Sequence, residues 1–187
     1  MHKFVVCCVA IVAFGVADAG VIADGPAPDS PPELQEFGRL VGAWKCTGFS
    51  RQKDGSWQPN PWQNTWTWYW ALGGTAIQDV WEAPPESPSG ASIGTNLRVY
   101  DPETSTWHMA WTTTLTHQFD LFTATQEGAD MVMQGRIPGR GPRPEHFARI
   151  TFHDMRERSY LWRYEASLSG KPDTWREQAR LECKRAD

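Results

Sequence analysis

The chain has 187 residues, a formal net charge of −4 at pH 7, and a composition of 40% hydrophobic and 12% aromatic residues. This length favours one domain with a substantial hydrophobic core. A mildly acidic chain without a basic block has no electrostatic footprint for nucleic acid or an anionic membrane surface, so neither is expected as a partner.

The first residues predict export. A short basic start, MHK, is followed by the apolar run FVVCCVAIVAFGVA and by small residues before Gly20. This order is typical of a secretory signal peptide, residues 1–19, with cleavage after Ala19. The apolar run is short for a membrane span. We therefore expect a secreted or periplasmic protein with no stable span after cleavage; an uncleaved anchor is the alternative.

Residues 20–33 are rich in proline and glycine, which predicts a flexible leader. The folded domain is expected over residues 34–187. Its first apolar residues recur with helical spacing, at Leu34, Phe37, Leu40 and Val41. This spacing predicts a short amphipathic helix of about two turns.

After Gly42 the pattern changes to an alternation of apolar and polar residues, interrupted by turn sequences such as KDGS, LGG and DPETS. This pattern predicts about ten strands, at residues 43–53, 62–71, 74–82, 93–100, 105–114, 118–127, 130–137, 146–154, 158–168 and 173–185. Short strands in a regular meander predict an all-β fold, an up-and-down antiparallel barrel. A β-sandwich is the alternative.

Two cysteines, Cys46 and Cys183, follow the predicted signal peptide. An even pair in an exported protein predicts a disulfide, with two unlinked thiols as the alternative. The first cysteine lies on the first expected strand and the second on the last. Because these strands must be neighbours in a closed meander, we expect the disulfide at the seam of the barrel.

The seam also predicts a register. If the two cysteines face each other, Trp44 lies opposite Arg185, whose guanidinium can stack on the indole ring. Lys184 or Arg180 would take this place after a slip of the register. The even positions of the last strand are polar and face solvent. Its odd positions then point inward, at Trp175, Glu177, Ala179, Leu181 and Cys183.

The segment WQNTWTWYW places tryptophans on one face of the second strand, at Trp62, Trp66, Trp68 and Trp70. They can fill a core, wall a ligand cavity or form an outward platform. An indole carries an N–H that needs a partner when buried, whereas aliphatic residues fill a dry core at less cost. We therefore favour a cavity, to which further tryptophans are expected to contribute: Trp81, Trp107, Trp111, Trp162 and Trp175.

Candidates for acid–base chemistry are Glu177, Asp120, His117 and Asp79, because a carboxyl group in an aromatic cavity would have a raised pKa. The first is favoured by its inward position, with an ion pair to Arg163 or Arg98 as its alternative. No His-x-His, Cys-x-x-Cys or Gly-x-Ser-x-Gly sequence occurs. We therefore expect no metal site and no activated nucleophile.

Two longer loops, 83–90 and 138–145, are the candidate lids of such a cavity. The second is rich in proline and glycine, and with the end of the preceding strand it carries Arg136, Arg140 and Arg143. These side chains can meet an anionic ligand at the barrel mouth; a solvated loop is the alternative.

The segment LVGAWKCTG resembles the opening strand of the calycin superfamily, which includes lipocalins, fatty-acid-binding proteins and nitrobindin-like proteins. Their shared feature is a short helix leading into Gly-x-Trp, here Gly42 and Trp44. A basic residue of the last strand commonly covers that tryptophan, and Arg185 matches it. The resemblance implies a lipocalin-like barrel with a short N-terminal helix.

Two further segments, WALGGTAIQDVWE and LRVYDPETSTWHMAW, look like those of bacterial secreted lipocalin-like proteins. That group pairs a Gly-Gly hairpin, matched by Gly73 and Gly74, with a later Tyr-Asp-Pro turn. The resemblance covers residues 36–115 well and the rest only in pattern.

The chain departs from nitrobindin-like proteins at two places. Their motif is Gly-x-Trp-x-Gly-x-Gly, and Cys46 replaces the middle glycine here. They hold haem through a histidine late in the chain, and the last expected strand has none. We therefore expect no cofactor; haem on His146 or His153 is a minor alternative.

These patterns together predict an exported binding protein that holds a small hydrophobic or aromatic molecule in a tryptophan-lined barrel. One alternative is an enzyme of the same fold, a lyase, isomerase or hydrolase with a buried carboxylate or histidine as acid or base. Another is a surface interaction module with the tryptophans facing outward.

Overall fold

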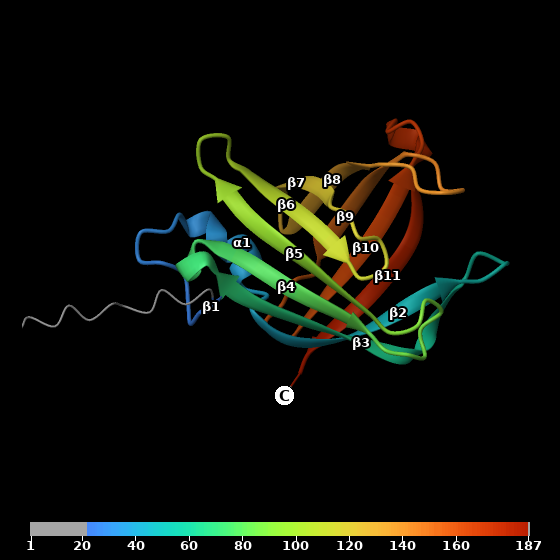
Figure 1. Ribbon diagram of the computed structural model, residues 1–187, viewed down its shortest axis with the longest axis horizontal. Coiled ribbons are helices and arrows are strands. Elements are labelled where there is room, and N and C mark those ends of the chain that lie inside the picture. Colours follow the sequence, from blue (N-terminus) through green and yellow to red (C-terminus); the bar gives the residue numbers. More distant parts are fainter. Residues whose placement is uncertain (1–21, 187) are drawn as a thin grey trace, which may run out of the picture.

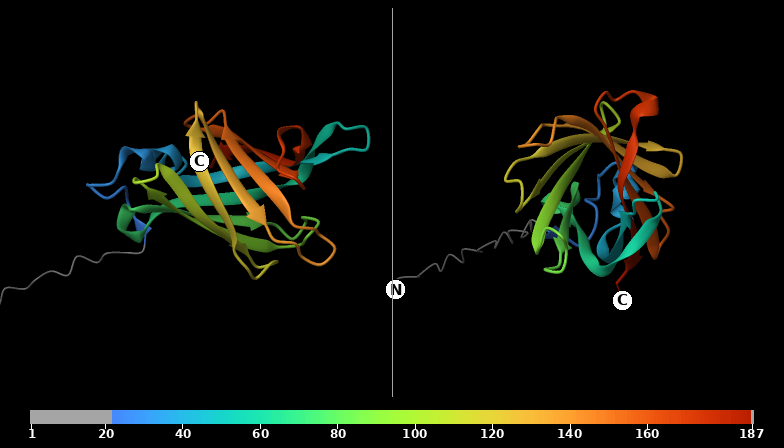
Figure 2. Two further views of the ribbon diagram at one scale, coloured as in Figure 1. Left: turned by 90° about the horizontal axis from the view of Figure 1, so that it is seen from above. Right: turned by 90° about the vertical axis from the view of Figure 1, so that its right-hand side faces the viewer.

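The computed structural model describes residues 22–186, and the predicted signal peptide with its cleavage after Ala19 lies outside them. Within the described part, ten long strands form one closed antiparallel barrel (Figures 1 and 2). Each expected strand is present: β2 (Gly42–Arg51), β3 (Trp57–Ala71), β4 (Ala76–Ala83), β5 (Ser92–Asp101), β6 (Thr106–Thr113), β7 (Asp120–Glu127), β8 (Asp130–Ile137), β9 (His146–His153), β10 (Ser159–Ser167) and β11 (Arg176–Arg185). The prediction of an all-β up-and-down barrel is confirmed. Among these residues no helix is long and apolar enough to cross a membrane.

The barrel closes where β11 pairs with β2. Cys46 lies opposite Cys183 and Trp44 opposite Arg185, as the sequence predicts. The two cysteines form a disulfide, with their Cα atoms 4.1 Å apart. The guanidinium carbon of Arg185 lies 4.3 Å from the centre of the Trp44 ring. First and last strands are thus joined by backbone pairing, a covalent link and a cation–π contact.

Arg185 also binds the segment that enters β2. Its Nη1 donates to the carbonyl oxygen of Val41 at 2.8 Å, and its Nη2 donates to that of Arg39 at 3.1 Å. Gly42 lies between, with φ at +129°, and a Cβ atom there would collide with the guanidinium. The backbone conformation of Gly42 therefore favours glycine, and a side chain there would also displace the Arg185 guanidinium from its hydrogen bonds.

The N-terminal segment 22–33 pairs with the barrel. The short strand β1 (Ile22–Ala23) is antiparallel to the end of β3. Beyond it, the amide of Ala27 and the hydroxyl of Ser30 both donate to the carbonyl oxygen of Gly74, at 3.0 and 3.3 Å. The composition predicts a flexible leader here and misses these contacts, because backbone pairing at a sheet edge does not depend on side-chain pattern.

The Gly-Gly turn accounts for that docking. It forms the short helix η2 (Leu72–Gly74) between β3 and β4, with φ of +65° at Gly73 and +90° at Gly74. A side chain at Gly74 would collide with the backbone of residues 25–27. Both glycines therefore permit the turn, and the second also admits the N-terminal segment.

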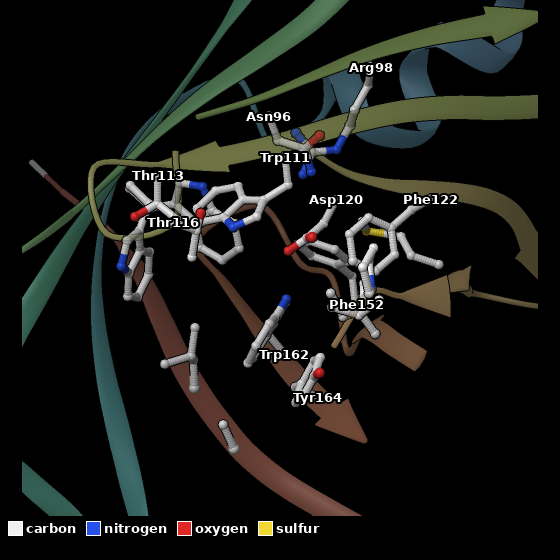
Figure 3. Close-up of a pocket in the computed structure, with 18 of the residues that line it drawn as sticks. Asn96, Arg98, Trp111, Thr113, Thr116, Asp120, Phe122, Phe152, Trp162 and Tyr164 are labelled. Atoms are coloured by element: carbon white, nitrogen blue, oxygen red, sulfur yellow. The ribbon is translucent and has the colours of Figure 1, made fainter. Parts of the chain in front are cut away.

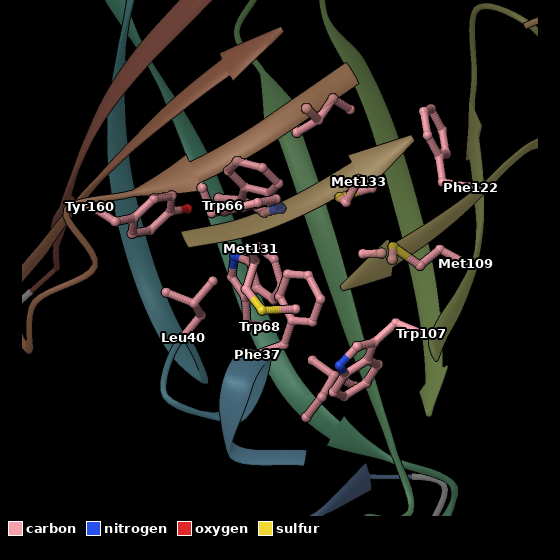
Figure 4. Packing of buried hydrophobic residues seen from close by; sticks show 14 of the residues in the cluster. Phe37, Leu40, Trp66, Trp68, Trp107, Met109, Phe122, Met131, Met133 and Tyr160 are labelled. Atoms are coloured by element: carbon pink, nitrogen blue, oxygen red, sulfur yellow. The ribbon is translucent and has the colours of Figure 1, made fainter. Parts of the chain in front are cut away.

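A short helical segment closes one end of the barrel. It comprises the 3-10 turn η1 (Pro32–Leu34) and, directly after it, the single α-helical turn α1 (Gln35–Gly38), which together make about the two turns expected. Its apolar side chains Leu34, Phe37 and Leu40 are buried. Phe37 packs edge-on against Trp107, with ring centres 5.1 Å apart, and lies 6.1 Å from Trp68 (Figure 4). This half of the interior is a packed core.

The tryptophans of β3 face the interior. Trp66, Trp68 and Trp70 are 5%, 1% and 5% exposed, so the outward platform is excluded for these three. The three rings lie at different positions along the barrel axis, however. Only Trp66 lies beyond the packed core, on the side that faces away from α1.

A β-bulge changes which residues of β11 face inward. Tyr164 lies opposite Ala179, but Glu165 lies opposite Glu177, so Gln178 is an extra residue. Because one extra residue reverses the alternation, Glu177 is turned outward. The prediction that it points inward is wrong. Its carboxylate instead forms a two-pronged ion pair with Arg180, at 2.6 and 2.8 Å.

Trp175 is also predicted inward and lies outside. It precedes the first residue of β11, and its ring contacts the guanidinium of Arg149, 4.6 Å from the ring centre. Arg149 lies between Ala148 and Ile150, which are buried, so it is on the outer face of β9.

We predict that replacing both Cys46 and Cys183 by alanine lowers the free energy of unfolding by about 2–5 kcal/mol. The bridge spans 137 residues of sequence, and its removal restores the entropy of that loop to the unfolded chain. Urea denaturation measures the difference, with reduced wild-type protein as the control. A double variant as stable as the oxidised wild type would contradict a bridged seam.

Candidate ligand-binding cavity

The interior beyond the packed core contains a cavity of about 450 Å³. Its lining includes residues of the β6–β7 and β8–β9 loops, which lie at the end of the barrel away from α1, the end that the right-hand view of Figure 2 faces. Side chains of nearly all strands and of two loops line it: Trp66, Trp81, Asn96, Arg98, Trp111, Thr113, Thr116, Asp120, Phe122, Met133, Ile137, Pro138, Arg140, Arg143, Ile150, Phe152, Trp162, Tyr164, Ala179 and Leu181. Most of these side chains are apolar, as in sites that take small organic molecules.

Four indoles form much of the wall, from β3, β4, β6 and β10. Figure 3 labels two of them, Trp111 and Trp162. Trp66 meets Trp81 edge-on with ring centres 5.0 Å apart, and Trp162 lies 6.4 Å from Trp66. Trp111 lies directly over Gly94, where a Cβ atom would collide with the indole. The missing side chain on β5 therefore provides the space for the ring of β6.

Of the nine tryptophans predicted to bind a ligand, these four line the cavity. Trp68, Trp70 and Trp107 are buried but do not line the cavity: the first and last pack against Phe37 of α1, and Trp70 lies against Gly38 of the same helix. Trp175 is on the outer face, and Trp62 is half-buried and outside the lining. The alternation predicts the face of a strand correctly, but it carries no information about height along the barrel, which decides between core and cavity.

A buried ion pair lies between core and cavity. Arg98 Nη1 donates to Oδ2 of Asp79, and Trp66 Nε1 donates to the other carboxylate oxygen at 2.8 Å. Both charged side chains are at most 1% exposed. Burial raises the pKa of Asp79, while the guanidinium and the indole N–H act in the opposite direction. The carboxylate lies behind the wall, and only the arginine reaches the cavity.

Arg98 and Asn96 are the deep polar groups of the cavity. The Asn96 amide satisfies its hydrogen bonds when its nitrogen donates to Ala110 O at 3.1 Å and its oxygen accepts from Arg98 at 3.2 Å. Arg98 Nε is buried without a partner. The sequence-based reasoning missed both as site residues, because β5 is inverted: its polar residues point inward, while Ile93 and Val99 are exposed. That inversion is itself the signal that could have identified them.

The mouth of the cavity is polar. Asp120 accepts from Arg140 at 2.6 Å. The hydroxyl of Tyr164 bonds to Nε2 of His146 at 2.8 Å, whose Nδ1 lies 3.2 Å from the carbonyl oxygen of Pro144. When Nδ1 carries the proton and donates to this carbonyl, Nε2 accepts a hydrogen bond from the Tyr164 hydroxyl.

Only one of the two predicted lids lines the cavity. Loop 138–145 contributes Pro138, Arg140 and Arg143, whereas loop 83–90 contributes no lining residue. Arg136 also lies elsewhere, paired with Glu145 at 2.5 Å on the exposed surface.

The candidates for acid–base chemistry do not converge. Asp79 is paired behind the wall, Asp120 is paired at the mouth, Glu177 is outside the barrel, and His117 is exposed on the β6–β7 loop. Between residues 22 and 186, no three His, Cys, Asp or Glu side chains gather closely enough to hold a metal ion. Neither haem candidate, His146 or His153, lines the cavity.

No protein-family model matches the sequence, and no curated protein sequence does. The fold is similar to that of the S-type phycobiliprotein lyase CPES from Guillardia theta, with a TM-score of 0.52. The two share 12% sequence identity, over 82% of this chain and 91% of that one. At this identity the likeness shows the fold alone. With the closed ten-strand barrel, it supports the calycin-like fold.

We predict that Arg98→Met lowers the free energy of unfolding by about 3–5 kcal/mol at pH 7, because it leaves the Asp79 carboxylate buried without its cation. The pKa of Asp79, already raised by burial, then rises further above that of the unfolded chain. At pH 7 the folded variant therefore holds a proton that its unfolded chain releases. The decrease in its free energy of unfolding becomes smaller as the pH falls toward about 4.

Urea denaturation across this pH range measures the effect. The double variant Asp79→Asn/Arg98→Met is the control, because it removes both charges: its loss at pH 7 should be smaller and nearly independent of pH. A single variant whose loss does not change with pH would contradict a charged, paired Asp79.

Proposed function

We propose that the protein is an exported binding protein that holds a small apolar or aromatic molecule inside the barrel. The observation that carries this proposal is the cavity of about 450 Å³, walled by Trp66, Trp81, Trp111 and Trp162 and reaching one end of the barrel. Its volume is in the range of known small-molecule sites, about 300–1,000 Å³. The indoles offer flat faces for stacking.

The energetics of packing support a ligand. A side chain that faces an unfilled space has fewer van der Waals partners than one in a packed core. A bound ligand removes apolar surface from water, which stabilises the complex by about 25 cal/mol per Å². Ala179, a small residue on the inner face of β11, lies opposite the large ring of Tyr164. A barrel that needed only stability would fill this space with larger aliphatic side chains.

The positions of the candidate acid–base residues give the enzyme alternative little support. General acid–base catalysis needs an ionisable side chain within hydrogen-bond reach of the reacting atoms. The four candidates are ion-paired, behind the wall or outside the cavity. The lyase name belongs to the structural neighbour, which at its low identity supports the fold and carries no activity over to this chain.

Export and the finer family assignment are part of the same proposal. The signal-like N-terminus and the Gly-Gly and Tyr-Asp-Pro motifs favour the bacterial secreted lipocalin-like proteins. The disulfide is of the kind that persists in oxidising compartments.

N-phenyl-1-naphthylamine, an uncharged aromatic probe that fluoresces when it leaves water, tests this function. We expect saturable binding to the mature protein, and a loss of affinity of about tenfold in Trp162→Ala, because a stacking face of the wall is removed. Trp175→Ala is the matched control, since it deletes an indole from the outer face of the barrel. Circular dichroism checks that both variants fold.

Ala179→Phe adds a second test, because it fills the cavity from β11 and should abolish binding. Failure of the wild type to bind the probe, or an equal loss in the Trp162 and Trp175 variants, would refute a binding role for the cavity.

A further inference from the structure

The charges that line the cavity are unequal. Three guanidinium groups and one carboxylate reach it, from Arg98, Arg140, Arg143 and Asp120. Arg98 is neutralised by Asp79 behind the wall, and Arg140 by Asp120 at 2.6 Å. Arg143 has no ion pair with any of the described residues. One cation at the mouth is therefore uncompensated.

The loop places this cation at the edge of the aromatic wall. Arg140 and Arg143 pair across a tight turn, with backbone N–H···O distances of 2.8 and 2.9 Å, and Gly141 within the turn has a φ of +55°. Both arginine side chains therefore line the same edge of the cavity. The backbone pairing fixes the turn independently of any ligand.

Tyr164 connects the cation with the indoles. Its ring is nearly parallel to that of Trp162, at 13° and 6.3 Å between centres. Its hydroxyl interacts with the guanidinium of Arg143; burial raises the pKa of this tyrosine, and the guanidinium opposes that effect. Figure 3 shows Tyr164 beside Trp162. A group bound to Arg143 would therefore adjoin a ring stacked along Trp162.

The deep end of the cavity is unsuitable for a negative charge. An anion beside Arg98 would share that cation with Asp79, which leaves one net negative charge buried among aromatic side chains. Such a charge is costly in a medium of low polarity. At the mouth, Arg143 is exposed, so an anion there keeps part of its hydration while it gains a cation.

We propose that the ligand is an amphipathic aromatic anion. Its apolar body lies among the indoles, and its anionic group, such as a carboxylate or sulfonate, lies against Arg143 at the mouth. This inference rests on the proposed function and adds the chemical class and the orientation of the ligand.

Two probes with the same body test it. 8-Anilino-1-naphthalenesulfonate has the ring system of N-phenyl-1-naphthylamine plus one sulfonate, so a change in their relative affinity reports the anionic group alone. Arg143→Gln should weaken the sulfonated probe about two- to fivefold more than it weakens the neutral probe, which is the range for an exposed ion pair of favourable geometry. Arg143→Lys keeps the charge and should retain most of the affinity.

Arg136→Gln is the matched control, because it removes a nearby exposed arginine whose guanidinium is paired with Glu145. It should change neither affinity. Rising salt should weaken the sulfonated probe more in the wild type than in Arg143→Gln.

The outcomes separate the two proposals. If Arg143→Gln affects both probes equally or neither, the anion site is overturned while the binding function stands on the neutral probe. If the wild type binds neither probe, the binding function fails and the anion site with it.

Discussion

The pairing of β2 with β11 is the constraint on which the rest of the structure depends. An antiparallel ladder has a side-chain period of two, so a slip by one residue would turn every inward side chain outward. The Cys46–Cys183 bridge and the Trp44–Arg185 stack both hold the seam in one register. Because each strand pairs with the next around the barrel, this register passes from strand to strand, except where a bulge such as that at Gln178 resets the alternation.

The interior is divided along its axis into two parts with different chemistry. Phe37, Trp68 and Trp107 fill the part beneath α1, and the part beyond it is walled by rings but not filled. The Asp79–Arg98 pair lies at the boundary: Arg98 stacks on the Trp68 ring at 4.2 Å and reaches the cavity on its other side. A buried pair of this kind is weak evidence for stability, and we interpret it as the polar floor of the cavity.

Much of this arrangement could be predicted from the sequence. Turn residues and alternation define the ten strands, and two cysteines on the terminal strands define the closure. The outward positions of Glu177 and Trp175 could not be predicted, because the bulge at Gln178 is set by the pairing with β10 and leaves no mark in the pattern. The position of each tryptophan along the barrel axis could not be predicted for a similar reason. Whether a ring belongs to the core or to the cavity depends on how far α1 enters the barrel.

The site residues Asn96 and Arg98 were missed because β5 reverses the usual rule that apolar side chains point inward. The inward orientation of these polar residues is explained by their partner on the neighbouring strand. Asn96 is opposite Asp79 on β4, and Arg98 forms its ion pair with that same carboxylate. Polar residues on neighbouring strands satisfy one another inside the barrel, a relation between segments that a single strand cannot display.

The central claim is that the tryptophan rings that line the cavity form a binding surface for a ligand. It is tested most directly by NMR of the indole N–H groups in isotope-labelled protein, assigned through single Trp→Phe variants, during a titration with N-phenyl-1-naphthylamine. The account predicts that the signals of Trp111 and Trp162 move with the ligand. Those of Trp175 and of Trp57, whose ring lies 4.2 Å from the guanidinium of Arg180, should stay in place. Shifts confined to the outer tryptophans, or no shifts at saturating ligand, would contradict it.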